Sequence, residues 1–276
     1  MTGRQRSPGG RPPTRSESEA PLPGGLANRG LVVRVADTVR RPQRSTSPAA
    51  HALLRHLEEV GFDGAPRFLG VDSRGREVLS YIPGTAVVPP FPEWALTDEA
   101  LVSVAALVRS YHRAVAGFDP TPYAWPQSPP DEYGRDLVSH NDLNLDNVIF
   151  REGRAVALID WDLAGPGSRL WDVACAARLW APLRPDASIH DTRRGRTFQR
   201  LRLFVDSYGL TEADRPRVAA AVLDNHLWFG RLIARYVAAG HEAFTEYSES
   251  AARPAEEQYR RWVADNAQAF AQALST

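Results

Sequence analysis

The sequence predicts an α+β chain in two lobes, a small β-sheet lobe with one helix and a larger, mainly helical lobe that carries a β-hairpin. Between residues 24 and 84, short runs rich in β-branched residues flank a single segment with helical spacing. From residue 85 to 276 amphipathic helical patterns dominate, interrupted over residues 147–160 by a second pair of strand-like runs. Strands followed by helices are typical of α+β architecture, so we expect the two lobes to divide near residue 84.

The composition points to a globular chain with a small partner. The 276 residues are 43% hydrophobic, and 33 basic and 33 acidic residues cancel. A chain without net charge has no global field that favours nucleic acid or an anionic membrane. No run is long and apolar enough for a membrane span, and one cysteine, Cys175, cannot form an intramolecular disulfide. We expect a cytoplasmic protein.

Residues 1–23 form the predicted tail. They are rich in Arg, Pro, Gly, Ser and Glu and contain almost nothing apolar. The entropy lost on ordering such a segment is not compensated by burial, so we expect disorder. Gly24 and Gly25 follow, and they are candidates for a mobile lid over phosphates or for a simple turn into the domain.

The small lobe reads as strand, strand, helix, strand, strand. Residues 31–35 and 38–41 suggest a hairpin, and a helix starts near Pro48 and ends at Gly61. Residues 67–71 and 77–82 are two further strands around a turn. In the large lobe the amphipathic patterns predict helices over residues 98–116, 170–180, 196–208, 211–238 and 256–274.

Chemistry concentrates in the segment from His140 to Asn147, an H-x-D loop with an asparagine five positions after the aspartate. The loop runs into the strand 147–150, and its antiparallel partner, 155–160, ends at Asp160. Phosphoryl transfer from a nucleotide needs a carboxylate near the attacking hydroxyl and oxygen ligands for Mg²⁺. The hairpin offers Asp142 as the base, with Asn147 and Asp160 as ligands at one edge.

Two other interpretations remain at this point. The same residues are common in turns, where they cap strand ends. His140, Asp142 and Asp160 are also possible ligands of a hydrolytic transition metal, although few other histidines lie nearby.

This loop, followed by a hairpin and an aspartate, resembles the catalytic segment of the aminoglycoside phosphotransferase family, relatives of choline kinases and protein kinases. The later Gly165-Pro166-Gly167 and Trp171-Asp172 also resemble that family. The resemblance implies a protein-kinase-like fold and an ATP-dependent small-molecule kinase. Carried over by position, it makes Asp142 the catalytic base, His140 the residue that orients its loop, and Asn147 and Asp160 the Mg²⁺ ligands, with Asp162 a weaker candidate.

The nucleotide side departs from the family pattern. In this fold a lysine on the third strand holds the phosphates and pairs with a glutamate on the next helix. The sequence contains no lysine, so Arg40 is the expected substitute, with Arg41 and Arg34 behind it. His51 occupies the position where the family commonly has glutamate. Backbone groups of Ser80, Tyr81 and Ile82, before Pro83-Gly84, are expected to meet the adenine.

The acceptor is expected to be a small molecule with a hydroxyl group, bound against the helical lobe near Asp142. A cationic amino sugar suits clustered carboxylates, but the acidic and aromatic candidates are equally typical of a solvated helical face. The candidates are Asp224, His226, Trp228, Glu242, Glu246 and Tyr247. The first hypothesis is therefore an active kinase using ATP or GTP. The alternative is a nucleotide-binding or immunity-type module that keeps the fold but catalyses little.

Overall fold

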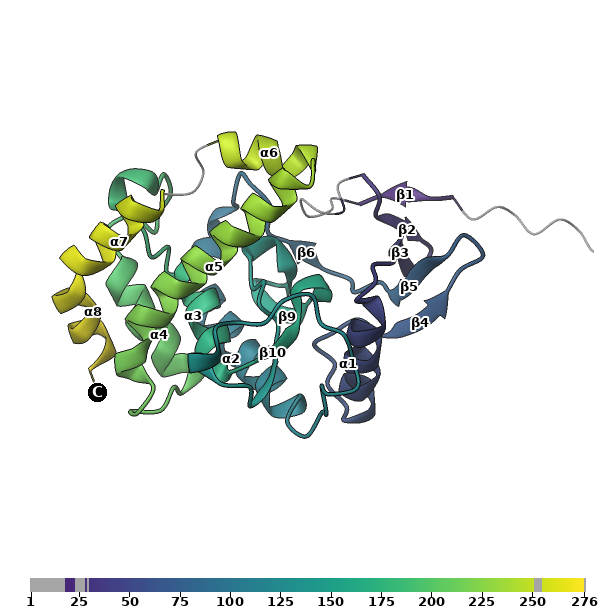
Figure 1. Ribbon diagram of the computed structural model, residues 1–276, viewed down its shortest axis with the longest axis horizontal. Coiled ribbons are helices and arrows are strands. Elements are labelled where there is room, and N and C mark those ends of the chain that lie inside the picture. Colours follow the sequence, from purple (N-terminus) through teal and green to yellow (C-terminus); the bar gives the residue numbers. More distant parts are fainter. Residues whose placement is uncertain (1–17, 23–27, 29, 251–254, 276) are drawn as a thin grey trace, which may run out of the picture.

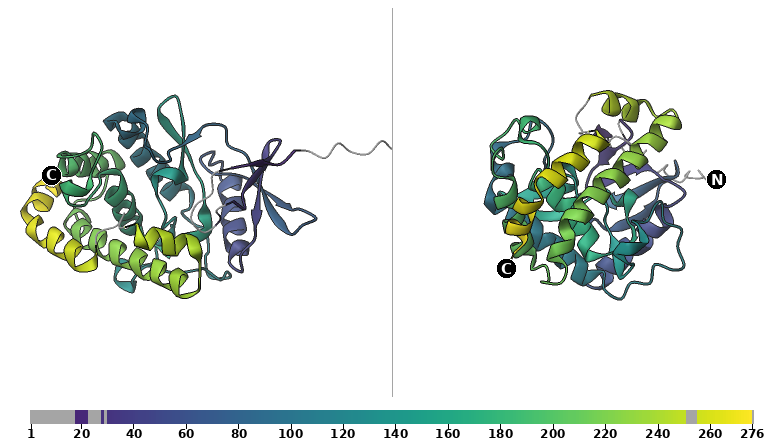
Figure 2. Two further views of the ribbon diagram at one scale, coloured as in Figure 1. Left: turned by 90° about the horizontal axis from the view of Figure 1, so that it is seen from above. Right: turned by 60° about the vertical axis from the view of Figure 1, so that its left-hand side comes forward.

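The computed structural model of the chain describes residues 18–22, 28, 30–250 and 255–275. Figure 1 shows a sheet and one helix at one end of the molecule and a group of helices at the other, and the turned views in Figure 2 keep this arrangement. The predicted α+β organisation, with a small sheet before a larger helical part, is confirmed.

The N-terminal sheet is antiparallel, with the strand order β1-β2-β3-β5-β4. Its single helix, α1, buries Leu53, Leu54 and Leu57, whose spacing places them on one face. The predicted order of strand, strand, helix, strand, strand is confirmed for β2 to β5. The bounds are β1 (Ala20–Pro21), β2 (Val33–Val35), β3 (Thr38–Pro42), α1 (Ser47–Glu59), β4 (Phe68–Val71) and β5 (Arg76–Ser80).

The predicted disordered tail, residues 1–23, is wrong for residues 18–22. Ala20 pairs with Arg34 and Pro21 with Val33, and the Leu22 N–H donates to Val32 O over 3.0 Å. A strand that adds to an open sheet edge is held by backbone hydrogen bonds and needs no apolar side chains. Residues 1–17 and 23, and the proposed lid glycines Gly24 and Gly25, lie outside the described residues.

The helical part contains the predicted helices with three differences. The helix expected over 211–238 begins at Val218, behind a 3₁₀ turn that contains Pro216. The pattern over 256–274 divides into two helices at Asn266, and α6 was not predicted. The bounds are α2 (Asp98–Ala114), α3 (Arg169–Trp180), α4 (Thr197–Tyr208), α5 (Val218–Ala238), α6 (Glu242–Glu249), α7 (Glu256–Asp265) and α8 (Ala267–Leu274).

The predicted hairpin among the helices is present as β8 (Val148–Arg151) and β9 (Arg154–Leu158), and β6 (Thr85–Ala86) pairs with β8. A second pair, β7 (Leu137–Ser139) with β10 (Gly165–Gly167), brackets the polar loop and the end of the hairpin. Trp161, Trp171 and Trp180 are buried around these strands. The hairpin is thus held between the sheet and the helical core.

Candidate active site

His140 begins the polar loop and is completely buried. Its Nε2 donates to Ile159 O over 3.1 Å, and its Nδ1 accepts from the Asp142 N–H over 3.3 Å. This pair of bonds requires the neutral ring with its proton on Nε2. Burial lowers the pKa of His140 to about 4, so the ring stays neutral. Both ring nitrogens are engaged, which leaves neither free to bind a transition metal.

Asp172, on α3, holds the same loop in place through hydrogen bonds. Its Oδ2 accepts the His140 N–H over 2.7 Å, and its Oδ1 accepts the Asn141 N–H over 2.9 Å. His112 Nε2 lies 3.0 Å from Oδ2. Asn141 has a φ of 65°, a left-handed conformation that few residues other than glycine adopt. The buried carboxylate therefore fixes a strained turn immediately before Asp142.

Asp142 is held by two amides of its own loop. Asn144 Nδ2 donates to Asp142 Oδ1 over 2.5 Å, and Asn147 Nδ2 donates to Oδ2 over 2.9 Å. Burial raises the pKa of Asp142 well above its usual range, and the nearby carboxylates of Asp160 and Asp146 raise it further. A carboxylate with a raised pKa is suited to accept a proton near neutral pH.

Stability should fall as the pH is lowered from 6.5 to about 4, because unfolded His140 binds a proton that the folded ring refuses. This group's contribution, roughly 3 kcal/mol, is present above pH 6.5 and lost toward pH 4. Urea unfolding at a series of pH values measures it. In His140→Gln the amide can still donate to Ile159 O but cannot titrate, so the difference between the two curves isolates the histidine. If the free energy of unfolding depends on pH in the same way in both proteins, the assignment of this pH dependence to His140 is contradicted.

Asn147 and Asp160 meet at the open end of the hairpin. The Asn147 amide nitrogen also donates to Asp142 O, and Asp160 Oδ1 accepts from Arg41 Nη1 over 2.7 Å. No described residue donates to Asn147 Oδ1 or to Asp160 Oδ2. Asp160 has a φ of 63°, so this position is also strained. Two free oxygens at one edge form a donor set that suits Mg²⁺, which is often held by one or two carboxylates together with phosphates.

Within the described residues, no group of three or more His, Cys, Asp and Glu side chains is placed to bind a metal ion. The transition-metal interpretation of His140, Asp142 and Asp160 is therefore not supported by their geometry.

The structure does not place Arg40 in the site. Arg40 Nε donates to Thr38 Oγ1, and Nη1 donates to Asp72 Oδ2 over 3.4 Å, on the outer face of the sheet. Consecutive residues of a strand point to opposite faces, so the next residue, Arg41, points inward. Its guanidinium binds Asp160 and, over 2.7 Å, Asp162. Arg41 lies two residues after Val39, which packs against the core. This two-residue spacing is the sequence signal that places Arg41 on the inner face of the strand.

Arg41 is also held by an acid that sequence reasoning missed. Its Nε donates to Glu77 on β5, the strand partner opposite Arg41, and the other oxygen of Glu77 lies 2.6 Å from His51 Nε2. His51 is buried on α1 and stacks on Phe68 at 3.7 Å. Burial opposes the charge of Arg41, but Asp160, Asp162 and Glu77 together raise its pKa above the usual value. The arginine is therefore a fixed cation.

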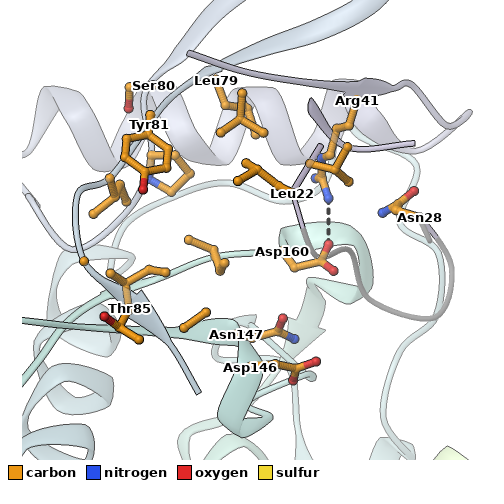
Figure 3. Close-up of a pocket in the computed structure, with 18 of the residues that line it drawn as sticks. Leu22, Asn28, Arg41, Leu79, Ser80, Tyr81, Thr85, Asp146, Asn147 and Asp160 are labelled. Atoms are coloured by element: carbon orange, nitrogen blue, oxygen red, sulfur yellow. Dashed lines mark hydrogen bonds and ion pairs between the residues drawn. The ribbon is translucent and has the colours of Figure 1, made fainter. Parts of the chain in front are cut away.

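A cavity of about 370 Å³ lies between the N-terminal sheet and the hairpin (Figure 3). Ser80 and Tyr81 line it on one side, Ile82 also lines it, and Arg41 projects toward Asp160 on the other side. The N–H groups of Ser80 and Tyr81 already donate to Arg67 O and Asp37 O. Among the described residues the Ile82 N–H has no acceptor.

A second cavity of about 510 Å³ opens on the helical side. Asp142 lines this cavity but not the first, whereas Asp146, Asn147 and Asp160 line both. Of the predicted acceptor candidates, Tyr247 alone lines it. Asp224 accepts from Tyr133, His226 stacks on Tyr259, and Trp228 donates to Ser128 O. The two cavities thus share Asp146, Asn147 and Asp160 as lining residues.

The chain is similar in sequence to known proteins. A sequence profile of the phosphotransferase enzyme family matches residues 121–204. The trifolitoxin immunity protein of Rhizobium leguminosarum bv. trifolii is 35% identical over 205 residues, which cover 70% of this chain and 75% of that protein.

Two solved structures share the fold. A choline/ethanolamine kinase family protein from Mesorhizobium loti gives a TM-score of 0.61 at 16% identity, covering 94% of this chain and 92% of that chain. A mutant of aminoglycoside 2′-phosphotransferase-IIIa in complex with GDP gives 0.60 at 13% identity, covering 94% and 95%. The predicted protein-kinase-like fold is confirmed. No helix in the described ranges has the length and apolar character to cross a membrane.

Proposed function

Because the chain belongs to the phosphotransferase enzyme family, we propose that it transfers the γ-phosphate of ATP or GTP to a hydroxyl group of a small molecule. The observation that carries the proposal is that two cavities share Asp146, Asn147 and Asp160 as lining residues, with Asp142 lining only the acceptor cavity. A nucleotide in one cavity and an alcohol in the other would meet at these shared residues.

In the proposed reaction the acceptor oxygen bonds to the γ-phosphorus, the bond from that phosphorus to the β-phosphate oxygen breaks, and the nucleoside diphosphate leaves. Asp142 accepts the hydroxyl proton, while Asn144 and Asn147 hold its carboxylate in place. His140 orients the loop through its bonds to Ile159 O and the Asp142 N–H. Asn147 Oδ1 and Asp160 Oδ2 would hold Mg²⁺, which offsets the charge of the phosphates.

For the nucleotide, we propose that the phosphate-binding cation is Arg41 and not Arg40. Arg41 lines the nucleotide cavity, and its planar guanidinium is suited to phosphate oxygens. The base would lie against Ser80, Tyr81 and Ile82, with the Ile82 N–H, which has no acceptor among the described residues, as donor. A cytoplasmic location stays a prediction.

Arg41→Gln should weaken ATP binding about tenfold or more, since a charge-assisted bond to phosphate is lost. Arg40→Gln is the matched control, because it removes the same charge from the neighbouring residue on the opposite face. Isothermal titration with ATP and Mg²⁺ measures both, after thermal unfolding has shown that each variant is folded. Weaker binding in Arg40→Gln with unchanged binding in Arg41→Gln would restore the original assignment.

A second candidate is a nucleotide-binding, immunity-type module with little catalysis. It is favoured by the relative named as an immunity protein and by the absence of lysine from the sequence. Incubation with ATP, Mg²⁺ and a panel of hydroxyl compounds, followed by mass spectrometry, separates the two. A phosphorylated product supports the kinase. Binding of ATP without any phosphorylated product across the panel supports the module.

A further inference from the structure

The acceptor cavity has an uneven distribution of charge. Its carboxylates lie on the catalytic loop and just after the hairpin, where the cavity meets the nucleotide. The basic lining comes mainly from other elements, with Arg178 on α3 and Arg184 and Arg193 in the segment that follows, while Arg44 pairs with Asp162. Glu242 and Glu246, expected to attract a cationic amino sugar, do not line the cavity. A cationic acceptor would therefore meet these arginines in the cavity.

The three arginines differ in how far they are already paired. Arg193 is buried and forms two hydrogen bonds to Asp191, of 2.9 and 2.8 Å, so its charge is balanced. Arg178 donates from Nε to Asn225 Oδ1 over 2.9 Å and lies over the ring of Phe229. Among the described residues nothing accepts from its two terminal nitrogens. Arg178 is therefore positioned by neutral groups, and its charge acts on the nearby carboxylate of Asp142, whose pKa it lowers against the larger effect of burial.

Arg184 has no side-chain partner among the described residues. Its Nε is buried without a hydrogen bond, although the residue lines the cavity. Burial lowers the pKa of Arg184 and Arg193 lowers it further, while Asp191 and Tyr247 act in the opposite direction without forming a hydrogen bond to it. An unpaired, partly buried guanidinium is costly, because lost hydration is not replaced by a protein acceptor. An oxyanion of a bound molecule would supply the missing acceptor.

Much of the remaining lining of the cavity is apolar and aromatic. Phe229, Leu232 and Tyr236 come from α5, and Phe244 and Tyr247 come from α6, which follows α5 along the chain and lies beside its end in Figure 1. Tyr236 stacks on Phe244 with ring centroids 4.2 Å apart. Such a lining favours an apolar or aromatic body.

We propose that the acceptor is anionic: a hydroxyl compound with an apolar body whose carboxylate or phosphate group binds Arg184 and Arg178, while its hydroxyl reaches Asp142. The inference rests on the proposed function for the identity of this cavity. It makes Arg184 a specificity-determining residue and distinguishes this chain from an enzyme built for amino sugars.

Binding measurements without nucleotide test the proposal separately from catalysis. The probes are matched sets in which one aromatic hydroxyl skeleton carries a carboxylate, a phosphate, a neutral hydroxymethyl or an ammonium group. We expect the carboxylate or the phosphate member to bind about tenfold or more tightly than the neutral member, and the ammonium member to bind least. Comparison of the carboxylate and phosphate members identifies which oxyanion the site prefers.

Arg184→Gln should abolish this preference, and Arg194→Gln, an exposed arginine of the same segment, should leave it unchanged. Asp142→Asn should retain the preference even though its phosphoryl transfer is slowed. Equal binding of all members, tighter binding of the ammonium member, or the same loss in Arg194→Gln would overturn the proposal. If the protein phosphorylates a cationic acceptor and the matched probes show no preference for anions, the proposed kinase function stands and the proposed site for an anionic acceptor is excluded.

Discussion

Asp142→Asn is expected to lower kcat for phosphoryl transfer by about 10²–10⁴-fold, the usual contribution of a positioned general base. The substitution preserves the shape of the side chain but removes its ability to accept the hydroxyl proton. Steady-state release of the nucleoside diphosphate, measured with an acceptor found by mass spectrometry, gives the rate. ATP affinity should change little, because Asp142 does not line the nucleotide cavity.

The pH profile gives a second measure of the same residue. A base acts only when deprotonated, and burial raises the pKa of Asp142. The rate of the unaltered protein should therefore fall with decreasing pH at a higher pH than for an ordinary aspartate. Asp136→Asn, at an exposed carboxylate near β7, is the control and should retain full activity. An Asp142→Asn protein as active as that control would exclude the proposed base.

Asp172→Asn is expected to destabilise the fold by about 3 kcal/mol. The carboxylate is completely buried and faces three nitrogen groups, from His140, Asn141 and His112. An asparagine retains one acceptor oxygen and turns an NH₂ group toward a donor, so a buried N–H loses its partner. Denaturant unfolding measures the loss.

The same substitution at Asp136, which forms an exposed ion pair with Arg169, should change stability little because surface pairs contribute weakly. Activity of the folded Asp172→Asn protein should also fall, since the strained turn at Asn141 is no longer held. Equal stability of the two variants would show that the loop does not depend on Asp172.

Local pattern was sufficient for the elements that hold the catalytic loop. The hairpin around residues 147–160 was predicted because two apolar runs flank a turn, and antiparallel pairing then brings Asn147 and Asp160 to one edge. Where the local sequence pattern predicted the wrong structure, an interaction outside that pattern determined the structure. Pro216 lies in a 3₁₀ turn before α5, and backbone pairing at a sheet edge ordered Ala20 and Pro21 despite their polar surroundings.

The sequence by itself determined the order of the elements and the spacing that joins Asp142 to Asn147 and Asp160, because a loop and its hairpin are contiguous in the chain. The tertiary structure decided which of two adjacent arginines faces the cleft, since that depends on strand register and on the packing of β3 against β5. It also decided the character of the acceptor cavity. Arg178, Arg184 and Tyr247 are far from the loop in sequence, and only the folding of the helices brings their side chains around one space.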